Sequence, residues 1–282
     1  MSKVKELFTY PANKRDVNWG EVVSSQYCRY SGKRCYKTRK SDPSIAIGTC
    51  VVSYGANPNS KDIIICPHRL LERKQIFIDC LHLLKSHTPG NELHIVPEVS
   101  IPGGSVDYFL VSTDSRRKVK DFVGIELQTM DTTGTVWPER QRLMQELGFQ
   151  EDGVILDKSY GMNWKMTSKT ILVQLHHKIN TFEHLNKHLI LVVQDCLMEY
   201  MRGEFSFEHI QDAKLGDSMH FHSYSFQNED SNNKLVLSNR CSTNSQGIER
   251  LLGLNVSANV EFDEMARILE GKISDDTMFT LL

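Results

Sequence analysis

The chain has 282 residues, of which 40% are hydrophobic and 24% are charged, and its formal net charge is −2. This composition is ordinary for a globular protein and excludes collagen-like or wholly disordered chains. The near-neutral charge excludes a simple basic-tail binder of polyanions, but it leaves room for local basic patches.

The N-terminal residues lack the apolar run of a signal peptide, and no stretch approaches 18 uninterrupted apolar residues. We therefore expect a cytoplasmic protein without a membrane partner. In that reducing compartment the seven cysteines are expected to be thiols or metal ligands rather than disulfides.

Charge is distributed unevenly along the chain. Residues 29–40 hold six cations and no acid, whereas the chain from Glu261 onward is rich in acids and has only Arg267 and Lys272 as cations. The basic segment predicts contacts with the phosphates of a nucleic acid.

Four cysteines lie in the first quarter of the chain: Cys28, Cys35, Cys50 and Cys66. No CxxC pair occurs among them, so scattered buried thiols are the alternative to a metal site. Apolar runs at 45–52 and 63–66 flank a turn-rich segment, and a hairpin there would bring two of the thiols together. Cys80, Cys196 and Cys241 are predicted to be small buried hydrophobic residues.

An amphipathic pattern from Leu70 to Lys85 predicts a helix that ends before Thr88-Pro-Gly. A short strand follows at 93–99 and carries Glu98 behind Pro97. Glu98 either joins the acids that follow it or faces solvent.

Two adjacent strands are predicted at 104–111 and 122–128, joined by a polar, basic turn. Side chains on a strand alternate between faces, so Glu126 and Gln128 share one face of their strand. Asp107 lies on the neighbouring strand, and it and Glu126 can therefore point at one metal ion.

The rest of the chain predicts a helix from Val136 to Leu147 and a second helix after Asn163. Lysines on the surface of the second helix, such as Lys165 and Lys169, either contact phosphate or are solvated. A nearly continuous apolar run at 188–194 is typical of a strand covered on both faces. Alternating strands follow at 218–226 and 234–238.

His220 and His222 are two residues apart on the first of these late strands. They could ligate a metal ion, but no third ligand is evident in the sequence. We therefore predict a polar, exposed face there.

The sequence contains no glycine-rich phosphate loop, no HExxH and no GxSxG motif. The predicted hairpin is thus the main chemical constellation. Two carboxylates are the expected ligands of Mg²⁺, which keeps several waters and binds substrate phosphate, and this favours phosphodiester hydrolysis. Gln128 has no proton affinity near neutral pH, so we expect it to orient the attacking water rather than deprotonate it.

The string Gly124-Ile-Glu126-Leu-Gln128-Thr-Met-Asp131 carries glutamine where PD-(D/E)xK nucleases have lysine. It resembles the corresponding segment of the NotI-type restriction endonucleases. The four early cysteines resemble the metal-binding cysteines of that family as well. The resemblance covers residues 20–180, and the chain departs from it in being shorter and in having Val106 instead of proline before Asp107.

The resemblance implies an α/β (α+β) fold with a PD-(D/E)xK nuclease core, in which helices flank a central mixed β-sheet. It implies a small N-terminal four-cysteine metal-binding element, and the chain would divide into residues 1–75 and 76–282. The implied catalytic residues are Glu98, Asp107, Glu126 and Gln128, with Mg²⁺ on Asp107 and Glu126. Iron or zinc on Cys28, Cys35, Cys50 and Cys66 would be structural and would hold the basic segment against DNA.

The implied activity is that of a type II restriction endonuclease, a homodimer that cuts double-stranded DNA at a GC-rich palindrome. A DNA methyltransferase gene is expected as its neighbour, because the host must protect its own sites. Two other functions fit the same residues: a structure-selective repair or recombination nuclease, and a catalytically silent, metal-stabilised DNA-binding protein.

Overall fold

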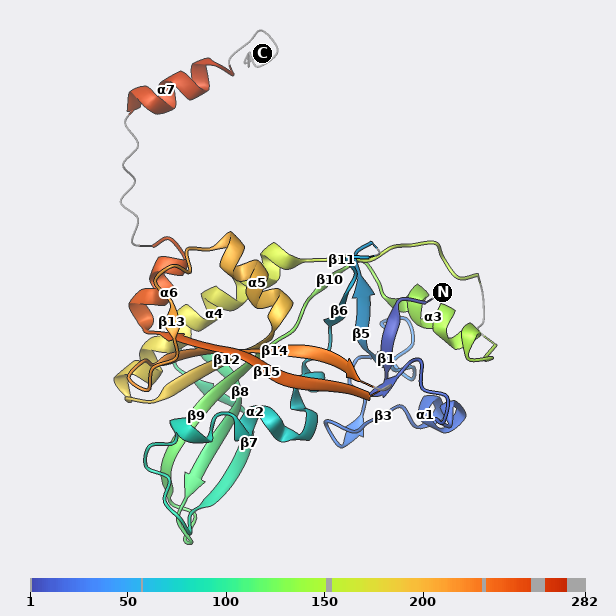
Figure 1. Ribbon diagram of the computed structural model, residues 1–282, viewed down its shortest axis with the longest axis horizontal. Helices are drawn as coiled ribbons and strands as arrows, with labels where there is room; N and C mark the ends of the chain where they lie inside the picture. Colours follow the sequence, from blue (N-terminus) through green and yellow to red (C-terminus); the bar gives the residue numbers. More distant parts are fainter. Residues whose placement is uncertain (1, 57, 151–153, 230–231, 255–261, 273–282) are drawn as a thin grey trace.

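The computed structural model describes residues 2–56, 58–150, 154–229, 232–254 and 262–272 (Figure 1). At its centre is a mixed sheet of seven strands in the order β13-β15-β14-β12-β9-β8-β7. The strands are β7 (Glu92–Ile101), β8 (Gly104–Thr113), β9 (Val119–Gln128), β12 (His188–Gln194), β13 (Gln211–Asp212), β14 (Met219–Glu229) and β15 (Asn232–Thr243). The expected α/β fold with a central mixed sheet is thereby confirmed.

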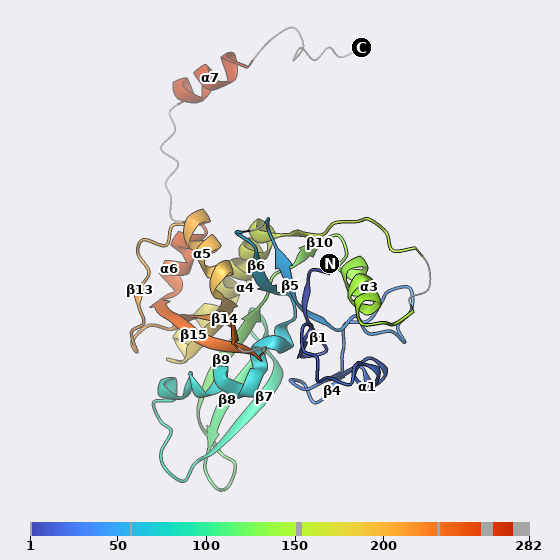
Figure 2. The ribbon, with the colours of Figure 1, turned by 45° about the vertical axis from the view of Figure 1, so that its right-hand side comes forward.

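Strands β7, β8 and β9 form an antiparallel meander. The next strand, β12, pairs in parallel with both β9 and β14. The parallel step requires a crossover, which α4 (Trp164–His184) provides. The apolar side of α4 packs on one face of the sheet, together with α5 (Asp195–Glu204) and α6 (Ser245–Leu251). In Figures 1 and 2 the far ends of β7, β8 and β9 project beyond the rest of the molecule.

A second, four-stranded sheet has the order β2-β1-β5-β6. It consists of β1 (Val4–Leu7), β2 (Tyr10–Pro11), β5 (Thr49–Tyr54) and β6 (Lys61–Ile64), and helix α1 (Trp19–Ser25) lies beside it. The hairpin of β5 and β6 confirms the strands predicted around Cys50 and Cys66. The predicted domain boundary at residue 75 stays a prediction.

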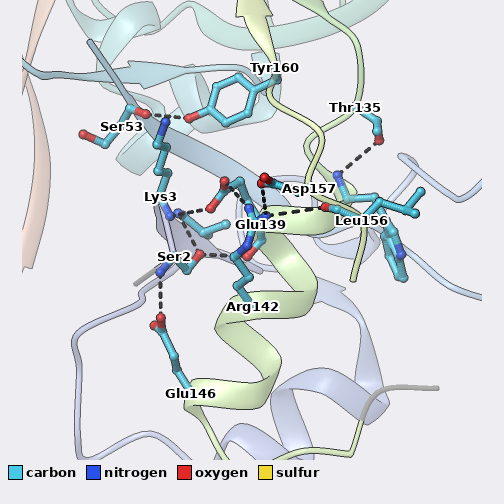
Figure 3. Close-up of polar contacts among 12 residues, drawn as sticks. Ser2, Lys3, Ser53, Thr135, Glu139, Arg142, Glu146, Leu156, Asp157 and Tyr160 are labelled. Carbon is cyan, nitrogen blue, oxygen red and sulfur yellow. Dashed lines mark hydrogen bonds and ion pairs between the residues drawn. The ribbon is translucent and has the colours of Figure 1, made fainter. Parts of the chain in front are cut away.

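Helix α3 (Trp137–Glu146), which follows β9 in the chain, packs against this second sheet (Figure 3). The backbone N–H groups of Ser2 and Lys3 donate to the carboxylates of Glu146 and Glu139, at 2.6 and 2.9 Å. Arg142 donates to the same Glu139 at 2.6 Å. The segment just after the candidate site is therefore anchored to the start of the chain.

The shorter elements are β3 (Tyr27–Cys28), β4 (Lys33–Arg34), β10 (Thr132–Thr133), β11 (Gly161–Met162) and α7 (Phe262–Glu270). Figures 1 and 2 both show α7 well apart from the rest of the described chain. None of the helices in the described part of the chain is long and apolar enough to cross a membrane.

The single helix predicted over residues 70–85 is wrong. The structure has three short pieces instead, η1 (Pro67–Lys74), α2 (Gln75–Ile78) and η2 (Leu81–Leu83). Tertiary contacts override the helical period here, because Glu72 adopts an extended ψ of 125° and its carboxylate accepts hydrogen bonds from Arg69 and from the Leu235 N–H.

Candidate active site

The meander places Asp107 and Glu126 at neighbouring positions on adjacent strands. β8 and β9 are antiparallel and pair with Tyr108 opposite Ile125. Asp107, one residue before Tyr108, therefore lies opposite Glu126, one residue after Ile125. Both acids lie on the face that α4 covers, where the rings of Phe109 and Phe182 stack 6.0 Å apart. The alternation predicted from the sequence therefore brings these two carboxylates together.

A glycine permits the close packing of α4 over this site. A Cβ on Gly124 would lie 2.3 Å from the Phe182 ring, nearer than two carbons can approach. A second close approach occurs at the turn between β7 and β8, where a Cβ on Gly103 would lie 2.0 Å from the His177 carbonyl oxygen. Gly103 also has a φ of +94°, which glycine adopts most readily. The two glycines fix the distance between the sheet and α4.

Glu126 is only 3% exposed, and its Oε1 accepts a 2.7 Å ion-pair hydrogen bond from the ammonium group of Lys178 on α4. Burial raises the pKa of Glu126 to about 7, because the loss of water disfavours the carboxylate. Lys178 opposes this rise, whereas the negative charge of Asp107 adds to it. Glu126 is thus balanced between its charged and neutral forms near neutral pH.

Asp107 is half-buried, and its Oδ2 accepts a 2.8 Å hydrogen bond from the backbone N–H of Leu127. Burial raises the pKa of Asp107, and the charge of Glu98 also acts in that direction, while the Leu127 hydrogen bond and Lys178 lower it. The two acids and the lysine therefore act on one another electrostatically. Such perturbed, mutually coupled groups are typical of functional sites, although structural ion pairs share the property.

Glu98 lies inside β7 at an irregularity of the strand. The pairing with β8 passes from Pro97 opposite Tyr108 to Val99 opposite Val106, so Glu98 stands across from Asp107. Its φ of +51° is unusual for a residue other than glycine. The residue is exposed, and its negative charge is near enough to Asp107 to raise the pKa of that carboxyl.

Gln128 ends β9 and is half-buried. Its side-chain amide donates to the carbonyl oxygen of Thr129 at 2.7 Å. That bond orients the amide group, whose oxygen is a hydrogen-bond acceptor. The predicted role of Gln128 in orienting water stays a prediction.

The donors in this site suit Mg²⁺. Carboxylate oxygens are its preferred protein ligands, and the ion usually takes only one or two of them and keeps several waters. Within the described ranges no group of three or more His, Cys, Asp or Glu is placed to hold a metal ion. Asp107 and Glu126 are the two carboxylates of this site that would hold one. Lys178 would have to share Glu126 with the ion.

Lys178 is the functional candidate that the sequence reasoning missed. It lies on the apolar stripe of α4 with Ile171, Leu175 and Ile179, all of them buried, and is itself 5% exposed. A lysine on the buried side of an amphipathic helix almost always has a charged partner. That position was the available signal, whereas the prediction considered Lys165 and Lys169, which are exposed.

The predicted four-cysteine metal cluster is not found among the described residues. The thiols have other partners: Cys50 hydrogen bonds with Cys66, and Cys28 with His68. The hydrogen bond from Cys50 lowers the pKa of Cys66 to about 6, although burial opposes the shift. Cys35 Sγ lies 4.0 Å from the Lys37 carbonyl oxygen. The thiols are near neighbours that bond locally, without a closed four-thiolate shell.

The prediction of an exposed face at His220 and His222 is also wrong. The two residues are 1% and 0% exposed, because η2 covers this side of β14 and brings His82 into a stack with His222. Burial lowers their pKa values, to about 4 for His220 and about 3 for His222, so both rings are neutral. By contrast, Cys80, Cys196 and Cys241 are buried as predicted.

The predicted basic segment makes several contacts within the chain. Arg29 donates to Thr9 and stacks on Tyr10, Arg39 stacks on Trp137, and Arg34 and Lys37 donate to backbone carbonyls. Lys33 and Lys40 are exposed. The segment is therefore held by its own contacts.

Comparison with protein-family models gives no match, and comparison with curated proteins gives none either. The geometry of the site and the motif residues are therefore the basis of the function proposed below.

Proposed function

We propose that this protein is a Mg²⁺-dependent endonuclease that hydrolyses phosphodiester bonds in double-stranded DNA, and that it acts as a type II restriction endonuclease. The observation that carries the proposal is the juxtaposition of Asp107, Glu126 and Lys178 on β8, β9 and α4. Two acids and a lysine on a mixed sheet crossed by a helix match the chemistry that PD-(D/E)xK nucleases use.

The lysine of that motif is absent from its usual place, since Gln128 occupies it. Lys178 supports the proposal because it brings an ammonium group to the same carboxylate from a different element, at 2.7 Å. We assign Lys178 the role of stabilising negative charge beside the phosphate, and Gln128 that of orienting water. Glu98 adds a third acid on the exposed side of the site.

Asp107 and Glu126 would hold the Mg²⁺ ion. When bound, the ion would lower the pKa of its water and stabilise the charge that grows on the phosphate oxygens. The protein residues would fix that chemistry in place: α4 covers the acids, the Leu127 N–H holds Asp107, and Lys178 shares Glu126 with the metal.

We propose double-stranded DNA as the substrate and a homodimer as the active form, since one such site per chain cuts one strand. A GC-rich palindrome as the target and a neighbouring methyltransferase gene follow from the family resemblance alone. Lys33 and Lys40 are the cations of the basic segment that we assign to phosphate contacts.

Digestion of plasmid DNA with the purified full-length chain in Mg²⁺, followed by sequencing of the ends, tests this function. We expect discrete fragments whose ends share one sequence, and no product with Asp107→Asn. Cleavage of branched DNA without a common end sequence would favour the repair nuclease instead. Sequence-selective binding without cleavage in Mg²⁺ or Mn²⁺ would favour the silent DNA-binding protein.

A further inference from the structure

An apolar groove of about 320 Å³ lies beside the candidate active site, between the meander and the end of α4. Its lining includes Val96, Val99, Val119, Phe122, Phe182 and Leu185, and all of the lining residues are apolar except Thr181. Several of them are open to solvent, with Val119 60% and Leu185 48% exposed. An apolar hollow on a surface is a place where another apolar element can pack.

The same chain contains a helix that lacks such a surface to pack on. In α7, Met265, Ile268 and Leu269 are 43%, 51% and 54% exposed. Residues at spacings of three and four share one side of a helix, so these three make a continuous apolar stripe. An isolated helix of nine residues is also too short to be stable in water without a packing partner.

Charge complements the two apolar surfaces. The α7 sequence has three acids, Asp263, Glu264 and Glu270, against the single cation Arg267. The turn between β8 and β9 at the rim of the groove presents Arg116, Arg117 and Lys118, all exposed, next to Val119. The acidic helix as a whole would therefore be attracted to the basic rim, although Asp263 and Glu270 lie on the side of α7 opposite the apolar stripe.

The chain is long enough to bring α7 to its own groove. The Ser245 N–H donates to Glu183 at 3.1 Å, which ties the start of α6 to the end of α4 beside the groove. The seven residues of α6 extend about 10 Å from that point. The seven residues 255–261 that precede α7 can span about 25 Å.

We propose that α7 of the same chain docks its Met265–Leu269 stripe into this groove. The docked helix would cover Phe109, which lines the groove and is two residues from Asp107. It would also cover Phe182, whose ring packs on Gly124, two residues from Glu126. The interaction does not depend on the proposed nuclease function, and its test has no catalytic readout.

Site-specific photo-cross-linking in the full-length chain tests the docking. Met265 is replaced by the photoreactive residue p-benzoylphenylalanine, and cross-linked peptides are identified by mass spectrometry. We expect a product of monomer size that joins residue 265 to peptides from 96–122 or 181–187. Cross-links to other surfaces, a product of dimer size, or no cross-link at all would overturn the proposal.

Two substitutions, each with a matched control, sharpen the result. Val119→Asp places a charge in the groove at a position that is 60% exposed, and Val236→Asp places one outside the groove, at a position on β15 that is 40% exposed. We expect Val119→Asp to lower the cross-link yield about tenfold or more, since 1.4 kcal/mol corresponds to a factor of ten, and Val236→Asp to leave it unchanged. On the helix, Leu269→Asp is expected to abolish the cross-link, whereas Arg267→Gln on the opposite side retains it. Equal yields in all four variants would contradict docking through the apolar stripe.

Discussion

The ion pairs Arg69–Glu6 and Lys178–Glu126 are both buried, and they differ in what surrounds them. Arg69 and Glu6 are both 0% exposed, with 3.0 Å between the guanidinium and the carboxylate. The Glu72 carboxylate accepts a 3.1 Å hydrogen bond from a second N–H group of Arg69. The rings of Tyr30 and Phe226 lie over the guanidinium. The pair joins β1 to η1, and Glu6 also accepts a 3.1 Å hydrogen bond from the Asn233 side-chain amide.

The pair of Lys178 and Glu126 is also buried, but a second carboxylate, Asp107, faces it, and a third, Glu98, lies at the exposed edge. Negative charge is thus in excess over one ammonium group. An excess of carboxylates at an exposed edge favours a cation from solution, whereas the two carboxylates beside Arg69 already accept hydrogen bonds from the Asn233 amide and from the Leu235 N–H. The neighbours of a buried ion pair, more than the pair itself, therefore separate a structural ion pair from a candidate functional site.

The largest expected effect is on DNA cleavage, which should depend on the Lys178–Glu126 site and not on the Arg69–Glu6 pair. Asp107→Asn removes the charge that we propose binds Mg²⁺ while keeping the shape of the side chain. We expect cleavage to fall about a thousandfold, the equivalent of several kcal/mol of transition-state stabilisation. DNA binding and the unfolding curve should change little. The matched variant Glu6→Gln should lower stability and leave the cleavage rate of the folded protein intact. Cleavage by Asp107→Asn at the wild-type rate would remove Asp107 from the site.

The second prediction concerns stability. Arg69→Met leaves Glu6 buried without its cation, and we expect a loss of about 3–5 kcal/mol in the free energy of unfolding, measured with urea. Arg73→Met nearby is the control and should cost far less, since Arg73 is exposed. Equal urea midpoints for Arg69→Met and Arg73→Met would show that the Arg69–Glu6 pair does not hold β1 against η1.

A smaller effect is expected from Lys178→Met. The loss of the ammonium group should lower the cleavage rate about 10- to 100-fold, the scale of a positioned charge near the reaction. It should also raise the pKa of Glu126 further, because Lys178 now lowers it. Lys169→Met on the exposed side of α4 is the control. A pH–rate profile distinguishes this role from a purely structural one, which would leave the midpoint of the profile unchanged.

The smallest effect is a dependence on pH. Glu126 has a pKa of about 7, so it holds a proton below that pH and is charged above it. Mg²⁺ affinity, measured by calorimetry, should therefore rise as the pH increases through 7. The linked contribution to stability has the opposite sign: because the folded pKa lies above the ordinary 4.5, that contribution is complete below pH 4.5 and is lost by about pH 7. Glu126→Gln should remove both steps, and a Mg²⁺ affinity that is flat from pH 6 to 8 would contradict the assignment.

Much of the sheet could be predicted from the sequence, because strand alternation and hairpin turns are local. The pairing of Asp107 with Glu126 follows from the period of two and one polar turn. Lys178 could not be placed this way, since its contact with Glu126 spans 52 residues and depends on the crossover of α4. Its position on an apolar stripe was the only local sign.

Contacts between side chains from segments that are distant in the sequence could not be predicted in the same way. Four cysteines in the expected order suggested one metal shell, but the direction of each thiol depends on turns that the spacing does not determine, and the side chains bond in pairs instead. The burial of His220 and His222 likewise depends on η2, which comes from a region whose helical period was broken by Glu72.

Metal-directed cleavage of the protein itself tests the central claim most directly. Fe²⁺ in place of Mg²⁺, with ascorbate and peroxide, generates hydroxyl radicals that cut the backbone next to the bound ion. We predict cuts close to residues 98, 107 and 126 in the wild-type chain, suppressed by excess Mg²⁺ and absent in Asp107→Asn. Cuts elsewhere in the chain, or the same cuts in Asp107→Asn, would contradict a metal site on Asp107 and Glu126.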